Sequence, residues 1–201
     1  MTEEEARDWI VRHHGQAALD RLGQFVTLLV DEAGRQNLIA PSTIPSIWSR
    51  HIVDSAQLAG FSTGTGLWLD IGSGGGLPGV VLALLTDRSF VLCEPRKLRA
   101  TFLQKAVAVL GLADRVSVAT SKVEALTIRA CTITARAVTG LDALVRAARG
   151  CADQDTDWIL PLGQSGAAQI QASTMLRRTV FHVEPSLTDP TATILVARGI
   201  A

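Results

Sequence analysis

The stretch Leu67-Trp-Leu-Asp-Ile-Gly-Ser-Gly-Gly-Gly-Leu-Pro-Gly79 decides how this chain folds. An apolar run, typical of a buried strand, leads directly into four glycines within five positions. Glycine lets the backbone turn sharply and approach a ligand closely, and Pro78 is tolerated in the first turn of a following helix. The stretch therefore predicts a strand, a glycine loop and a helix, with a ligand site at the carboxyl edge of a sheet.

Strands and helices alternate downstream of this loop. We expect strands at 67–71, 90–93, 116–119, 132–135 and 158–162, and helices at 77–85, 97–110, 141–149 and 164–176. Such alternation predicts an α/β fold with a mainly parallel sheet covered by helices on both faces. The runs 179–183 and 192–197 have no helix between them, so we expect them to pair as an antiparallel C-terminal hairpin.

The part of the chain upstream of the loop is predicted to be helical. Thr2 and Glu5 have the spacing of a capping box. Apolar residues then recur at helical spacing, at Leu19, Leu22, Phe25, Val26 and Leu29. A short helix is expected over 47–58, and residues 60–66, rich in Ser, Thr and Gly, are expected to link two units. We therefore predict a helical N-terminal extension at 1–60 and a second domain at 61–201.

The composition limits the classes of function. Lys plus Arg equals Asp plus Glu at 19 each, so any RNA contact needs a local basic patch. The neutral charge does not decide the oligomeric state, and we expect a monomer. Three cysteines, Cys93, Cys131 and Cys151, lack CxxC spacing, which argues against a disulfide framework and a metal site. No signal-peptide core or bilayer-spanning run is present, which predicts a cytoplasmic protein without membrane contact.

Two cofactors compete for the glycine loop. Residues 74–79 formally match the dinucleotide fingerprint GxGxxG, but Gly72, the glycine directly after the strand, does not start such a match. The pattern from Asp70 is instead an acid followed by GxGxG, with glycines at Gly72, Gly74 and Gly76. An acid at a strand end favours the cationic S-adenosylmethionine, which has no phosphate to bind. We favour this cofactor and keep an NAD-dependent oxidoreductase as an alternative.

Three further segments are expected at the same edge of the sheet. Glu94 ends the next strand, where an acid commonly accepts hydrogen bonds from ribose hydroxyls of either cofactor. Val123 and Glu124 follow the strand at 116–119 and are candidates to frame an adenine ring. Arg136 ends the strand at 132–135 and is a candidate to bind a phosphate, pair with a carboxylate or cover the site. A surface arginine is the simpler alternative at this position.

At these residues the sequence resembles the glucose-inhibited division B family, bacterial methyltransferases that modify guanine N7 in small-subunit ribosomal RNA. The matching segments follow the family's order and are Asn37-Leu38, Arg50-His51-Ile-Val-Asp54-Ser55, Asp70 to Gly79, Lys97 with Phe102-Leu103, Val123-Glu124 and Arg136-Ala137. The most specific part is Arg-His-x-x-Asp-Ser followed by Gly-Leu-Pro-Gly. The sequence departs from the family at Lys122, Ala135 and Leu162, and Leu162 stands where the family usually has a lysine.

The resemblance implies a class I, Rossmann-like methyltransferase fold with a seven-stranded sheet and a helical N-terminal extension. It implies a cofactor site with Glu94 as the ribose acid, formed with Gly72, Leu77, Val123, Glu124 and Arg136. Arg50, His51 and Asp54 would lie beside this site, to contact RNA or order the segment above it. A histidine bonded to Asp54 within its helix is an equally weighted structural alternative for His51.

The chemistry is consistent with the absence of a nucleophile–base pair, paired carboxylates and a metal cluster. Guanine N7 carries a free lone pair, so the enzyme chiefly has to place it in line with the methyl group. Arg136 and His51 are candidates for that positioning. The expected partner is small-subunit ribosomal RNA or its particle, with a target guanine in a loop or turned out of its stack. Candidate RNA contacts are Arg50, Arg96, Lys97 and Arg99.

Two other functions stay open at this point. One is a methyltransferase that acts on a small molecule or a protein, which the fold does not exclude. The other is a non-catalytic module that binds the cofactor without turnover.

Overall fold

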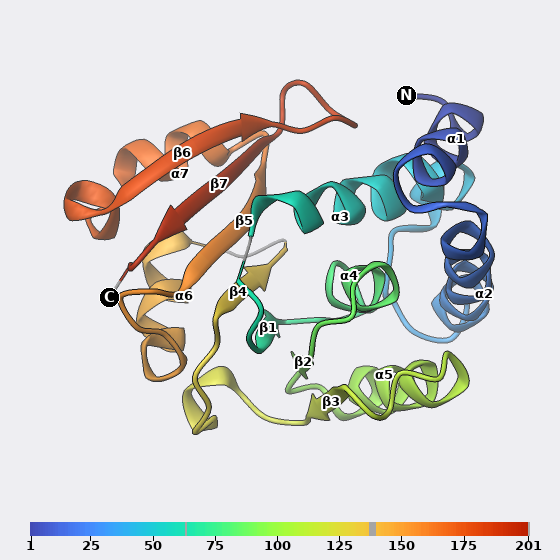
Figure 1. The fold of residues 1–201 in the computed structure, drawn as a ribbon, viewed down its shortest axis with the longest axis horizontal. Helices are drawn as coiled ribbons and strands as arrows, with labels where there is room; N and C mark the ends of the chain where they lie inside the picture. Colours follow the sequence, from blue (N-terminus) through green and yellow to red (C-terminus); the bar gives the residue numbers. More distant parts are fainter. Residues whose placement is uncertain (63, 137–139, 201) are drawn as a thin grey trace.

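The computed structural model describes residues 1–62, 64–136 and 140–200, and its centre is one seven-stranded sheet (Figure 1). The strands are β1 (Trp68–Ile71), β2 (Phe90–Cys93), β3 (Val116–Ala119), β4 (Thr132–Ala135), β5 (Asp157–Gly163), β6 (Val180–Pro185) and β7 (Thr193–Arg198). Their order is β3-β2-β1-β4-β5-β7-β6. The first five are parallel, and β7 is antiparallel to both β5 and β6, so the predicted sheet and C-terminal hairpin are confirmed.

Helical segments surround this sheet. The α-helices are α1 (Glu3–His14), α2 (Gln16–Ala33), α3 (Asp54–Ala56), α4 (Gly79–Leu85), α5 (Lys97–Val109), α6 (Leu141–Ala148) and α7 (Gly166–Ala172). The shorter or irregular helices are η1 (Pro41–Ser46), the π-helix η2 (Trp48–Val53), η3 (Gln57–Phe61), η4 (Val123–Ala125), η5 (Arg149–Cys151) and η6 (Met175–Arg178). The predicted capping box is confirmed, because Thr2 and Glu5 at the start of α1 exchange side-chain and backbone hydrogen bonds.

The sheet separates two hydrophobic clusters, as the alternation of side chains along a strand requires. Trp68 of β1 and Ile159 of β5 belong to the first cluster, together with apolar residues of α2, α4 and α5. Leu69 and Trp158, their neighbours along the strands, belong to the second cluster with α6. Both faces of the central strands are therefore buried, which explains their nearly continuous apolar sequences.

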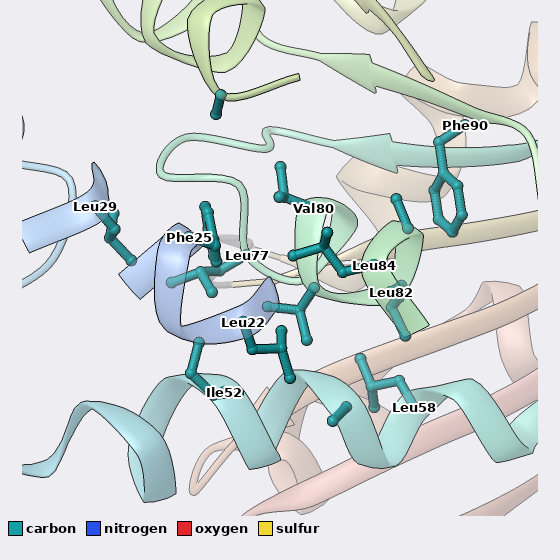
Figure 2. Close-up of a cluster of buried hydrophobic side chains, with 14 of the residues drawn as sticks. Leu22, Phe25, Leu29, Ile52, Leu58, Leu77, Val80, Leu82, Leu84 and Phe90 are labelled. Atoms are coloured by element: carbon teal, nitrogen blue, oxygen red, sulfur yellow. The ribbon is translucent and has the colours of Figure 1, made fainter. Parts of the chain in front are cut away.

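The N-terminal helices pack on the same face as α4. Figure 2 shows Leu22, Phe25 and Leu29 of α2 directed toward Leu77 and α4, in the cluster of buried side chains that they share. Arg21 of α2 and Arg115 before β3 donate hydrogen bonds to carbonyl groups in the last turn of α4. Thr86, the C-cap residue, donates from its Oγ1 to the Leu82 carbonyl at 2.9 Å, and the two arginines supply donors for the following carbonyl groups.

Three predicted segments differ from the structure. The helix expected over 164–176 ends at Ala172, because the next residues turn to bind Asp142, whose Oδ2 accepts from the backbone N–H of Thr174 at 3.0 Å. The helix expected over 47–58 is a π-helix followed by a short α-helix and a 3₁₀ turn. The helix expected over 77–85 begins at Gly79, because the turn through Pro78 precedes it.

The stretch expected to link two units is tied to the sheet. Ser62 is buried, and its hydroxyl donates to Asp157 Oδ2 at 2.9 Å and lies 2.9 Å from Thr132 Oγ1. Side chains at Gly64 or Gly66 would overlap Cys131, so these glycines allow the chain to pass close to β4. The division of the chain at residue 60 stays a prediction, and that boundary falls within η3.

Candidate active site

The glycine loop after β1 has the backbone conformation that its sequence predicts. Gly72, Gly74 and Gly76 have φ angles of 71°, 52° and 83°, in the region that residues with a side chain rarely adopt. Gly79 begins α4 against β1 and β2, where a Cβ would lie 2.4 Å from Leu92 Cδ2 and 2.6 Å from Asp70 Oδ2. The glycines therefore serve two purposes, which are the turn itself and the close packing of α4 on the strands.

Asp70, in β1, supports the start of α4 from the protein interior. Its side chain is fully buried, and its carboxylate accepts from the Gly79 N–H at 3.2 Å and from Thr134 Oγ1 at 2.9 Å. Burial raises the pKa of Asp70 to about 6, while Ser73, Thr134 and the Gly79 N–H partly oppose the shift. The carboxylate is thus mostly ionised at neutral pH. Since its oxygens face the protein interior, it would favour a cation through its charge and not through direct contact.

Glu94, at the end of β2, meets the other side of the loop. Its Oε2 accepts from the Gly74 N–H at 2.9 Å and its Oε1 from the Arg96 N–H at 2.9 Å. The side chain is only 3% exposed, so the carboxylate is fixed in orientation. Each oxygen has a second lone pair with which to accept a ligand hydroxyl.

The segment that carries Val123 and Glu124 lies at η4. Val123 is buried, whereas Glu124 is exposed. Two thiols bond to its backbone, since Cys93 Sγ donates to the Ser121 carbonyl at 3.2 Å and Cys151 Sγ lies 3.9 Å from the Val123 carbonyl. Burial raises the pKa of Cys93 to about 11, so this thiol is unreactive near neutral pH. Cys93 and Cys151, which are both buried, therefore support the segment next to the glycine loop.

Arg136, directly after β4, joins a polar chain that runs into the N-terminal extension. Its Nη2 donates to His51 Nδ1 at 3.2 Å, and His51 Nε2 lies 2.8 Å from Thr43 Oγ1, which donates to the Ala40 carbonyl at 2.7 Å. A guanidinium only donates, so Nδ1 must accept and the proton of the neutral ring sits on Nε2. Burial and the charges of Arg136 and Arg50 lower the pKa of His51 to about 4.

Both simple alternatives for these residues are wrong. Arg136 is not a free surface arginine, because its side chain is 21% exposed and its Nη1 lies 3.5 Å from Asp54 Oδ2. His51 bonds to Arg136 and Thr43 and not to Asp54. Thr43 was missed by sequence reasoning, since an isolated threonine beside two prolines carries no signal of its partner.

Two cavities flank Arg136 and Asp54. One has a volume of about 380 Å³ and is lined on its far side by Leu162, Ser165 and Thr193. The other has a volume of about 340 Å³, and Arg50 and His51 line it. Leu162, where the resemblance leads us to expect a lysine, lines the first cavity with an apolar side chain. That the loop between β6 and β7 lines these cavities was not predicted from the sequence.

The remaining candidate RNA contacts divide into two kinds. Arg50 is exposed beside the second cavity, and Arg96 and Lys97 are exposed at the start of α5. Arg99 is half-buried, and its Nη2 donates to the Asn37 carbonyl at 2.8 Å. Arg99 therefore ties the N-terminal extension to α5, and an additional contact with RNA stays a prediction.

The N-terminal extension also packs on the glycine loop, through Leu29 and Leu38. A Cβ at Gly75 would lie 3.1 Å from Leu29 Cδ1 and 3.3 Å from Leu38 Cβ. Gly75 is buried, and Leu29 and Leu38 supply the atoms nearest to this Cβ position. The third glycine in the run Gly-Gly-Gly is thus explained by packing of the extension on the loop.

Several predictions concern what the described residues contain. Residues 1–62, 64–136 and 140–200 include no group of three or more His, Cys, Asp or Glu side chains that could hold a metal ion. Within the same residues, no helix has the length and apolar character to cross a membrane. Ala137, part of the matched segment Arg136-Ala137, lies outside the described residues.

The strand order, the glycine loop after β1 and the acids at the ends of β1 and β2 define a Rossmann-like methyltransferase. Two solved structures share this fold. A methyltransferase from Geobacter sulfurreducens has a TM-score of 0.61 and 14% identity, covering 87% of this chain and 88% of that one. A putative S-adenosyl-L-methionine-dependent methyltransferase from Methanococcus maripaludis has a TM-score of 0.58 and 15% identity, covering 87% and 91%.

The sequence comparisons identify the family. Residues 18–185 match GidB, described as rRNA small subunit methyltransferase G. The chain is 43% identical to the ribosomal RNA small subunit methyltransferase G of Sphingopyxis alaskensis, over 98% of this chain and 86% of that protein. It is 44% identical to the protein of the same name from Rhizorhabdus wittichii, over 100% and 94%. The chain therefore belongs to the GidB family of methyltransferases, which confirms the resemblance and decides against the oxidoreductase alternative.

Proposed function

We propose that this protein transfers a methyl group from S-adenosylmethionine to N7 of a guanine in small-subunit (16S) ribosomal RNA. The observation that carries the proposal is the position of Arg136. This residue follows β4, next to the strand that leads into the glycine loop, and it lines both cavities. We further propose that the protein acts as a monomer in the cytoplasm, on ribosomal RNA or its ribonucleoprotein particle.

The residues around the glycine loop fit S-adenosylmethionine. Asp70 supplies buried negative charge beneath the loop, which suits a cation, and Glu94 holds lone pairs for ribose hydroxyls. Val123 and Glu124 would flank the adenine, and Leu77 would close the apolar side. When bound, the cofactor supplies the activated methyl group. Gly72 has no atom within 4 Å of the position of a Cβ, so the loop leaves space at its first turn.

The cavity side fits a neutral acceptor that needs no deprotonation. His51 is neutral above about pH 4, and its Nδ1 lone pair already accepts from Arg136, so it is not available as a base. The role left to His51 is to orient Arg136. With Asp54 and His51 holding two of its nitrogens, Arg136 keeps further N–H donors for an acceptor such as guanine O6. Arg136 and its two partners therefore support positioning of the acceptor as the main contribution to the rate of methyl transfer.

The test is transfer of radiolabelled methyl from S-adenosylmethionine to small ribosomal subunits that lack the modification, followed by nucleoside analysis. Label in 7-methylguanosine is expected, and it would also show that Leu162 is tolerated. Label in another nucleoside, or none despite demonstrated cofactor binding, would refute the proposal and leave a different acceptor or a binding protein.

A variant tests the role of Arg136 in the same assay. Arg136→Lys keeps the positive charge, but one ammonium cannot reproduce the planar set of donors to Asp54 and His51. We expect turnover to fall by about 10²-fold, as for a misplaced positioning group. Arg12→Lys, at an exposed site on α1, is the matched control. Full turnover by Arg136→Lys with unchanged cofactor affinity would contradict the assigned role.

A further inference from the structure

The loop between β6 and β7 is fastened to the helical segment that carries His51. The loop is closed on itself, because the Ser186 N–H donates to the Ala192 carbonyl at 3.0 Å. Asp54 Oδ1 then accepts from Ser186 Oγ at 3.2 Å and from Thr188 Oγ1 at 3.1 Å. Figure 1 shows this loop extending from the end of β6 toward α3, although α3 is far from the loop in the sequence.

Gln57 makes a second attachment. Its Oε1 accepts from the Leu187 N–H at 2.9 Å, and its Nε2 donates to Ser186 Oγ at 3.1 Å and to Asp54 Oδ1 at 3.1 Å. Gln57 is 8% exposed, so these bonds are largely shielded from water. The Gln57 amide therefore bonds both to the β6–β7 loop and to Asp54, the carboxylate that also binds this loop.

The fastened loop forms a wall of both cavities. Ala192 lines each of them, as do Gly163, Asp54 and Arg136, so the loop faces the end of β5 across Arg136. Along the sheet, the glycine loop follows β1, Arg136 follows β4 and Gly163 ends β5, and these three strands are neighbours in that order. The wall therefore stands on the side of Arg136 that is away from the glycine loop.

We propose that Gln57 and Thr188 are positioning residues for the RNA acceptor, because they hold the β6–β7 loop as the wall against which the target purine is placed. This inference rests on the proposed function. The two residues touch the loop and Asp54, and their removal lets the wall move relative to Arg136. Binding of the cofactor, on the other side of Arg136, does not depend on them.

Two variants weaken the attachment to different extents. Thr188→Val removes one hydroxyl with little change of shape, and Gln57→Ala removes the whole buried amide. Matched controls are Thr27→Val and Gln24→Ala on the exposed side of α2. For each protein, the measurements are cofactor affinity by calorimetry and KM and kcat for methylation of unmodified small subunits.

We expect Thr188→Val to raise KM for the subunit about tenfold, the size of one hydrogen bond to a charged group. Gln57→Ala should raise it further, while both variants keep cofactor affinity within about twofold of wild type, and the controls change neither quantity. An unchanged KM in a folded Thr188→Val protein would overturn the inference, as would an equal loss of cofactor affinity. If wild type itself methylates no RNA, the proposed function falls and this inference falls with it.

Discussion

Replacing glycine by alanine should have opposite effects at two helical positions of this chain. Gly79→Ala places a Cβ 2.4 Å from Leu92 Cδ2, 2.6 Å from Asp70 Oδ2 and 2.9 Å from Asp70 Cβ. Gly23, within α2, has no atom within 4 Å of the same position. The first change must therefore move α4 away from the strands, and the second adds a methyl group in open space.

The magnitudes follow from these contacts. Overpacking costs about 1–3 kcal/mol, and stretching the hydrogen bond from the Gly79 N–H to the buried Asp70 carboxylate adds about 1–3 kcal/mol. We therefore expect Gly79→Ala to lower the free energy of unfolding by at least about 2 kcal/mol. Gly23→Ala should raise it by about 0.5–1 kcal/mol, because alanine loses less backbone entropy in a helix.

Urea unfolding followed by circular dichroism measures both effects. With a slope of about 2 kcal/mol per molar urea, Gly79→Ala should shift the midpoint down by about 1 M. Cofactor affinity should fall in parallel, because α4 and the glycine loop share Asp70 as a support. A Gly79→Ala protein that unfolds at or above the wild-type midpoint would show that the packing of α4 on β1 is not as close as described.

Three further predictions concern charge. Because the pKa of Asp70 is about 6 in the folded protein against 3.8 ordinarily, its contribution to stability is full below pH 3.8 and is lost as the pH rises through 6. Wild type should therefore gain about 1 kcal/mol over Asp70→Asn between pH 7 and pH 5, and equal differences at both pH values would contradict this. The imidazole of His51 should titrate near pH 4 by NMR and leave no inflection near pH 6.5 in the methylation rate, whereas an inflection near pH 6.5 that His51→Asn removes would contradict the lowered pKa of His51. The carboxylate of Glu3 accepts from the Trp48 and Ser49 N–H groups at 2.9 Å each, so Glu3→Gln should cost about 1 kcal/mol of stability, while Glu4→Gln at an exposed site should cost little.

Local signals made most of the sheet predictable. The strands at 90–93, 116–119 and 132–135 have the predicted bounds, because short apolar runs between turn signals leave little freedom. Helix ends were less predictable where a distant partner decides them. The end of α7 depends on Asp142, which lies 32 residues before Thr174.

The part of the site that could be predicted is the part that local sequence patterns mark. Glycines after a strand and an acid at the end of the next strand are local patterns, and Gly72, Gly74, Gly76 and Glu94 lie together as expected. The groups that hold His51 and Asp54 beside Arg136 were not predictable in the same way. Thr43 bonds to His51 and the β6–β7 loop bonds to Asp54, and no spacing in the sequence encodes such contacts.

The place of β7 in the sheet has a consequence for the order of folding. β7 follows β6 along the chain but lies between β6 and β5, so β6 contacts the sheet only through β7. Because β6 precedes β7 along the chain, it has no partner in the sheet until β7 has paired with β5. Val180, Phe181 and Val183 stay exposed on this edge strand in the folded protein, and an edge strand with exposed apolar side chains is a template for pairing with another chain.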